Sequence, residues 1–129
     1  MPLVLQTTFM VPYALLALRI ITAIVFFSSG KSHVQKPEER GQQIGMSPKA
    51  TQFLGTVEIM GAFSIALGLF AQCGALIIMA VMLGAIHKKL FIWKTDFYAD
   101  KGYGWHYDLT WFIAAWVILA TDGGPFTIL

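Results

Sequence analysis

The chain has 129 residues, of which 57% are apolar and 12% are charged, and its net charge is +2. This length leaves room for one domain. The composition is far from that of an ordinary water-soluble protein, and the small net charge gives no basic patch for binding nucleic acid. Cys73 is the one cysteine, which excludes an internal disulfide, a CxxC redox pair and an iron–sulfur cluster held by cysteines of this chain.

Four predominantly apolar runs follow one another along the chain, over residues 11–29, 50–70, 73–92 and 106–121. Each has about 16–21 residues, which is near the length that a membrane-spanning helix needs. We therefore predict an all-α membrane protein whose four transmembrane helices form one antiparallel bundle. They belong to a single domain over residues 1–129.

The ends of these runs carry helix-boundary signals. Pro12 fits the first turn of the first helix, and Gly30 is expected to end it. Ser47 fits the N-cap of the second helix, with Pro48 at its first position. The short turn after Phe70 forces the second and third helices into an antiparallel hairpin.

The positive charges predict how the chain is oriented. Arg19 lies within the first apolar run, whereas the other eight Lys and Arg residues lie in two loop regions or at the adjoining end of the third run. These eight are Lys31, Lys36, Arg40, Lys49, Lys88, Lys89, Lys94 and Lys101. By the positive-inside rule, loops 30–49 and 93–105 face the cytoplasm and both termini face outward. The segment 90–107 mixes aromatic and charged residues, so we expect it to lie along the cytoplasmic surface of the bilayer. The alternative is a lid that contacts a quinone or pigment.

Arg19 and Glu58 are the charges deepest within the apolar runs, where a charge needs a partner or water. Counting residues puts Arg19 about 12 Å and Glu58 about 18 Å from the outer end of a core of about 30 Å. An Arg side chain reaches across such an offset. We therefore expect an Arg19–Glu58 ion pair near the midplane.

The histidines lie in the cytoplasmic half of the chain, together with Asp108. His87 lies on one stripe of the third helix and is expected to point inward. The other members of this stripe are Cys73, Ile77, Ala80 and Gly84. The candidate site consists of Arg19, Glu58, His87, His106 and Asp108. It fits a hydrogen-bonded network that holds the helices in register, or a quinone or other redox-cofactor pocket. Metal or haem ligation by His87 with His106, and conduction of protons or solutes, are further alternatives.

Bulky aromatics on the last helix predict an interface. Five bulky aromatics cannot all point into a four-helix core of mostly small residues, so some must face outward: Phe26, Phe27, Trp111, Phe112 and Trp116. We expect this helix to contact another membrane subunit, or a bound pigment or quinone, through Trp111 and Trp116. The alternative is contact with lipid alone.

A set of short motifs resembles the DoxX family in its order along residues 11–128. The motifs are Leu18-Arg19, Ser29-Gly30, Gly55-x-x-Glu58-x-x-Gly61, Gly68-Leu69, His87, Gly104-Trp105-x-Tyr107-x-Leu109 and Gly123-Gly124-Pro125-Phe126. The chain departs from the family pattern at His106, where members often carry glutamate, and at Gln72, where they often carry a basic residue. The resemblance implies a multi-pass, four-helix protein of the bacterial inner membrane.

The resemblance also implies a link with quinone-coupled thiosulfate oxidation, with resistance to quinones and oxidative stress, and with membrane-bound oxidoreductase assemblies. The sequence contains no dinucleotide fingerprint, nucleophile elbow or zinc motif. We therefore favour an accessory subunit of a respiratory or photosynthetic electron-transfer complex, not catalytic on its own, with other membrane subunits as partners. The alternatives are a quinone-linked oxidoreductase component that uses the Glu58 and His87 region, and a small transporter.

Overall fold

The computed structural model describes residues 7–98 and 104–127, and all regular elements in these ranges are helical. In chain order they are a 3₁₀ turn (Thr8–Met10), α1 (Val11–Gln35), α2 (Pro37–Ile44), α3 (Pro48–Leu67), α4 (Ala71–His87), the π-helical turn η2 (Lys88–Ile92) and α5 (Trp105–Thr121). The predicted all-α class is confirmed. Residues 99–103 of the second predicted loop lie outside the described ranges.

Three of the described helical segments are long and apolar enough to cross a membrane: Thr8–Gln35, Pro48–Leu67 and Ala71–Ile92. The fourth predicted span corresponds to α5, which has 17 residues and is about 26 Å long. This is slightly less than the apolar thickness of a bilayer, about 30 Å. The chain is therefore a multi-pass membrane protein, and the fourth crossing stays a prediction.

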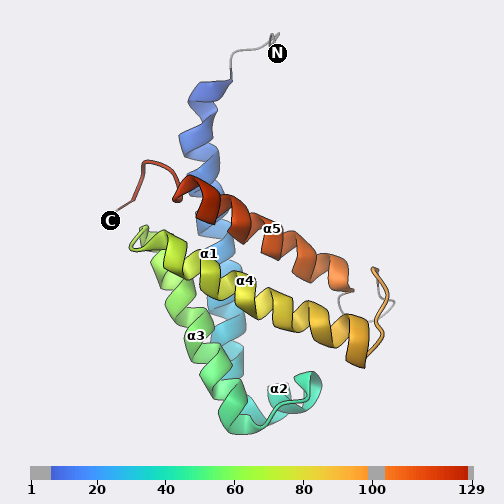
Figure 1. Ribbon diagram of the computed structural model, residues 1–129. Coiled ribbons are helices and arrows are strands. Elements are labelled where there is room, and N and C mark those ends of the chain that lie inside the picture. Colours follow the sequence, from blue (N-terminus) through green and yellow to red (C-terminus); the bar gives the residue numbers. More distant parts are fainter. Residues whose placement is uncertain (1–6, 99–103, 128–129) are drawn as a thin grey trace.

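The helices are arranged as two antiparallel pairs. α1 packs along α3, and α4 packs along α5 (Figure 1). The two pairs meet near the start of α4 and the end of α5, and they diverge toward the end of the molecule that carries α2 and η2. This divergence differs from the single antiparallel bundle that the sequence predicts.

Small and medium apolar side chains form the core where the pairs meet. They are Ala23, Phe26, Ala62, Ile65, Ala71, Ala75, Ile78, Met82, Ala115 and Ile118. Phe26 is the largest of these side chains and packs edge-on against Trp111, with the ring centroids 5.8 Å apart. The alanines let the helix backbones approach closely, which is the usual way in which helices associate in lipid.

The closest approach of α1 and α3 is a contact between two glycines. A β-carbon at Gly30 would lie 2.6 Å from the carbonyl oxygen of Gly55, and one at Gly55 would lie 2.6 Å from the carbonyl oxygen of Gly30. The same β-carbon at Gly55 would lie 2.8 Å from the β-carbon of His33. Any side chain at these glycines would push the two helices apart.

The first helix continues six residues past its predicted end, and the loop predicted over residues 30–49 contains a second helix. Gly30 does not end α1 because its missing side chain serves the contact with α3 and its backbone stays helical. α2 begins with Pro37 at its first position and carries Glu38 and Glu39 in its first turn, where acidic residues favour a helix start. The predicted N-cap of α3 is confirmed, because the Ser47 hydroxyl accepts a hydrogen bond from the Ala50 amide at 3.2 Å.

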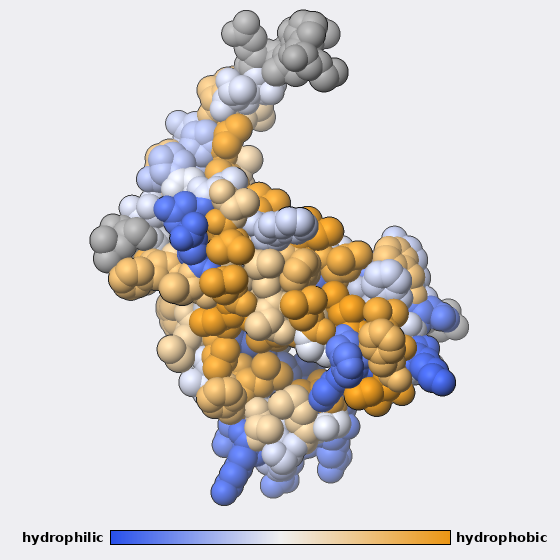
Figure 2. Space-filling model, in the orientation of Figure 1, coloured by the Kyte–Doolittle hydropathy of each residue, from blue (hydrophilic) through white to orange (hydrophobic). Residues whose placement is uncertain are grey.

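The outer surface agrees with contact to lipid. Large apolar side chains on the outward faces of the helices are well exposed, among them Phe53, Met60 and Leu83. Figure 2 shows this apolar surface over the helices, with hydrophilic side chains gathered around α2 and around the end of α4. So many exposed large apolar side chains would be unfavourable in contact with water.

We predict that Gly55→Ala destabilises the protein by about 2 kcal/mol or more, because the added methyl group overlaps the backbone of α1. The matched control is Gly84→Ala on α4, where an added β-carbon meets nothing within 4 Å. The control should be neutral or slightly stabilising, since alanine favours a helix over glycine. Thermal unfolding in detergent measures both effects. Equal melting temperatures for the two variants would contradict the glycine contact.

Candidate functional site

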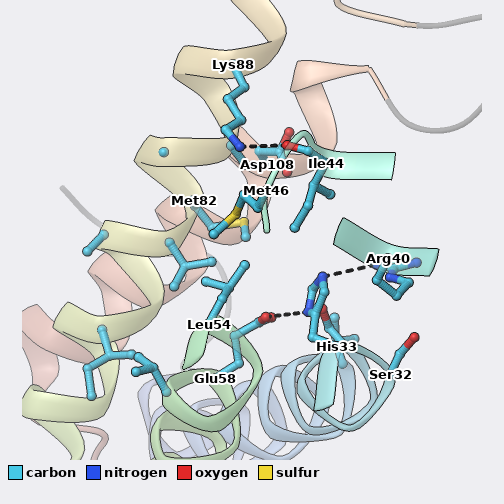
Figure 3. A pocket seen from close by; sticks show the side chains of 18 of the residues that line it. Ser32, His33, Arg40, Ile44, Met46, Leu54, Glu58, Met82, Lys88 and Asp108 are labelled. Atoms are coloured by element: carbon cyan, nitrogen blue, oxygen red, sulfur yellow. Dashed lines mark hydrogen bonds and ion pairs between the residues drawn. The ribbon is translucent and has the colours of Figure 1, made fainter. Parts of the chain in front are cut away.

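A cavity of about 1000 Å³ lies where the two helix pairs diverge. Apolar side chains from α1, α3 and α4 line most of it, including Ile24, Val57 and Ile77. Polar side chains line the part next to α2 and η2 (Figure 3). A largely apolar cavity with a few polar groups at one end is typical of a binding site for a small amphipathic molecule.

Three side chains form a hydrogen-bonded row in the wall of the cavity. His33 Nδ1 lies 2.8 Å from Glu58 Oε1, and Arg40 Nη2 lies 3.4 Å from His33 Nε2 (Figure 3). His33 and Glu58 are buried, and they come from α1 and α3, whereas Arg40 comes from α2. The row therefore joins the buried carboxylate to the α2 side of the protein.

The chemistry of the side chains assigns the hydrogens in this row. A guanidinium group only donates hydrogen bonds, so His33 Nε2 is the acceptor of the Arg40 hydrogen. Nδ1 of the same ring then carries a hydrogen, and it faces Glu58 Oε1 at 2.8 Å. The extension of α1 beyond Gly30 and the bare backbone of Gly55 bring His33 into this position.

Two lysines at the end of α4 complete the polar end of the cavity. Lys89 Nζ lies 2.8 Å from Asp108 Oδ2 and ties η2 to α5. Lys88 Nζ donates to the backbone carbonyl of Ile44 at 2.6 Å and ties η2 to the end of α2. Within the described ranges Lys88 has no acidic partner, and neither has Arg40, which contacts His33 and Gln43.

Arg19 binds backbone carbonyls, and the predicted Arg19–Glu58 ion pair is wrong. Its guanidinium donates to Ile65 at 2.9 Å, to Ala66 at 3.2 Å and to Gly123 at 3.4 Å, and also to Phe126. The carbonyls of the last turn of α3 lack the i+4 amide partner of the helix interior, so they can accept further hydrogens. The Ile65 carbonyl accepts the Gly68 amide at 3.3 Å and Arg19 as well. Arg19 binds these carbonyls at the end of the molecule where the two helix pairs meet. Glu58 lies nearer the cavity, beside His33.

The inward position predicted for His87 is also wrong. Its side chain is exposed and lies against Phe91, with the ring centroids 5.3 Å apart. The buried face of α4 carries a different set of residues: Ala71, Gly74, Ala75, Ile78 and Met82. α4 is apolar on every side, so its periodicity alone could not indicate which face is buried.

The other two histidine and carboxylate predictions have different outcomes. His106 Nδ1 lies 2.5 Å from the carbonyl oxygen of Phe97 and its ring lies beside Tyr98, so it supports the loop before α5. Asp108 lines the cavity. Among the residues that the structure describes, no group of three or more His, Cys, Asp and Glu side chains could hold a metal ion.

The cavity thus brings together two of the five predicted site residues, Glu58 and Asp108, with a set that the sequence analysis did not single out as a site: His33, Arg40, Lys88 and Lys89. One signal could have found His33. It follows Gly30 by three residues, just as Glu58 follows Gly55, and this spacing puts each polar side chain on the helix face of its glycine.

The two tryptophans of the predicted interface have different environments. Trp111 packs against Phe26 and the core, so it is not free to contact a partner in full. Trp116 is 56% exposed on the outer surface of α5. Of the two tryptophans, Trp116 has the exposure that the predicted interface needs, and the interface itself stays a prediction.

Double-mutant cycles should separate the two polar contacts of α1. We predict that His33→Leu and Glu58→Leu are coupled by about 1–3 kcal/mol, because each removes the partner of the other. Arg19→Leu and Glu58→Leu should be additive within about 0.5 kcal/mol, since these residues bind different groups. Unfolding free energies in detergent measure both cycles. Coupling between Arg19 and Glu58 would contradict the structure.

Comparison with known proteins identifies the family. A family model described as DoxX matches residues 14–95, which include nearly all of α1 together with α2, α3, α4 and η2, whereas α5 lies beyond the matched region. The searches of curated proteins and of solved structures found no match. Because the family model covers more than half of the 129 residues, the chain belongs to the DoxX family.

Proposed function

We propose that this protein binds a lipid-soluble quinone in its cavity and acts as a quinone-binding subunit of a membrane electron-transfer system. The observation that carries the proposal is the buried row of Arg40, His33 and Glu58 in the wall of a largely apolar cavity of about 1000 Å³. A quinone has an apolar chain and a ring with two polar oxygens, which matches this division of the cavity into apolar and polar parts.

The lining residues support one orientation of such a ligand. The ring would lie at the polar end, between Glu58 on α3 and Lys88 at the end of α4. The apolar chain would follow Ile24 and Ile77 toward the middle of the membrane-spanning helices. A buried carboxylate and a cation beside an apolar channel are costly in a membrane unless they serve binding or proton movement.

The chain's own contribution to quinone chemistry would be binding and proton transfer. Conversion of a quinone to a quinol takes up two electrons and two protons, and the reverse reaction releases them. In the proposed role a partner oxidoreductase exchanges the electrons, while His33 and Glu58 hold or pass protons at the ring oxygens. Arg40 keeps the His33 ring in the orientation that points Nδ1 at Glu58.

The role as a subunit rests on the outer surface. Trp116 offers a large exposed ring on α5 that would suit packing against a helix of a partner subunit. The placement in a bacterial inner membrane with both termini outside is part of the same proposal. It is supported by the Lys and Arg residues that gather around α2 and η2.

Binding of a short-chain benzoquinone to the full chain in nanodiscs tests the proposal. Trp93 lines the cavity, so saturable quenching of tryptophan fluorescence is expected, and it should decrease in Trp93→Phe. Gly84→Phe should weaken binding by about tenfold or more, because Gly84 borders the cavity and the new ring would occupy it. Leu83→Phe, on the exposed face of the same helix, is the control and should bind like the wild type.

Empty nanodiscs correct for partition of the quinone into lipid. If neither the oxidised nor the reduced form binds above this background, the proposed function is wrong. Equal binding by Gly84→Phe and Leu83→Phe would place the ligand outside the cavity and would also contradict the proposal.

The orientation can be tested with the native Cys73, which is exposed at the start of α4 and is the one cysteine of the chain. We predict that a membrane-impermeant maleimide labels Cys73 in intact cells, because the turn between α3 and α4 should face outward. Cys73→Ser provides the background. Labelling in inverted membrane vesicles alone would reverse the orientation.

A further inference from the structure

The Arg40–His33–Glu58 row determines which hydrogen bonds the cavity can offer to a ligand. Because Arg40 donates to His33 Nε2, the imidazole must donate from Nδ1 to Glu58 Oε1. Glu58 accepts a hydrogen from His33, and the positively charged Arg40 lies on the opposite side of the His33 ring. His33 and Arg40 thus present a hydrogen-bond donor and a positive charge to Glu58, which are the partners of a carboxylate acceptor.

Glu58 keeps accepting capacity for the cavity. His33 faces one carboxylate oxygen, Oε1, and among the described residues no hydrogen bond to the other oxygen, Oε2, is found. Glu58 lines the cavity, so a ligand there can supply the missing hydrogen. An ionised carboxylate only accepts, and it would repel a carbonyl oxygen placed against it.

Among the described residues, Asp108 and Lys88 do not supply the missing hydrogen to Glu58. Asp108 is paired with Lys89, and Lys88 donates to the Ile44 carbonyl from one of its three hydrogens. Lys88 can donate to a hydroxyl oxygen as well as to a carbonyl oxygen, because both accept. Lys88 therefore tolerates either oxygen, whereas Glu58 distinguishes between them.

A quinone and its quinol differ in this respect. The ring oxygens of the quinone are carbonyls that only accept, whereas those of the quinol are hydroxyls that donate and accept. We infer that the cavity binds the quinol form more tightly than the quinone form, with Glu58 as the residue that makes the distinction. This inference rests on the proposed function and adds to it the redox state of the ligand.

The expected preference follows from the cost of an unpaired buried group. A site built to hydrogen-bond a hydroxyl rejects an analogue without it, because its own polar group is left without a partner. For one carboxylate we expect a preference of about tenfold or more for the quinol. Tighter binding of the reduced form raises the midpoint potential of the bound couple, by about 30 mV for each factor of ten.

The test compares both redox forms of one short-chain benzoquinone on the full chain in nanodiscs, under anaerobic conditions. Equilibrium dialysis with chromatographic quantification gives the two dissociation constants, and empty nanodiscs give the background. The wild type should bind the quinol about tenfold more tightly or better. This ratio is read without any substitution, so it does not depend on how a variant folds.

Glu58→Gln should reduce the preference to near one, because an amide donates as well as accepts and suits both forms. Glu39→Gln is the matched control, since Glu39 is an exposed carboxylate on α2, and it should keep the wild-type ratio. Equal or tighter binding of the quinone by the wild type would overturn the inference while leaving the proposed function intact. An unchanged ratio in Glu58→Gln would also overturn it, whereas no binding of either form would overturn both proposals.

Discussion

The structure depends on one constraint: polar side chains within apolar helices must find their partners inside the chain, because lipid supplies none. Two such contacts hold α1 against α3. Arg19 binds the carbonyls at the end of α3, and His33 binds Glu58 farther along the same helix pair. The contact of Gly30 with Gly55, next to His33 and Glu58, brings the two backbones close together there. The α1–α3 pair is therefore fixed along most of its length.

The constraint also explains why the cavity lies at one end of the molecule. At the end where the two helix pairs meet, Arg19 joins three parts of the chain, namely α1, the end of α3 and the segment after α5. Toward the other end no comparable contact joins the two helix pairs among the described residues, and only Lys88 bridges from α4 to the end of α2. The pairs are free to diverge there, and the polar side chains at that end line the cavity.

The sequence was sufficient for the features that depend on local composition, and insufficient for those that depend on how helices pair. Apolar runs and capping residues located α3 to within a few residues, and small residues beside Glu58 indicated its inward position correctly. The partner of Arg19 could not be found this way, because backbone carbonyls at a helix end leave no mark in the sequence. His87 was misplaced for a related reason, since α4 is apolar on all sides.

The missed site residues show a further limit that has a physical cause. Arg40, Lys88 and Lys89 were counted as topology signals, because basic residues beside a membrane-spanning helix usually serve to orient it. In the structure the same residues also line the cavity. Both uses follow from one property: a cation at the membrane boundary can reach the headgroup region with its charge and still extend over the end of an apolar cavity. In a chain of this size the predicted membrane boundary lies close to the polar end of the cavity, so the cations that predict the orientation also face the cavity.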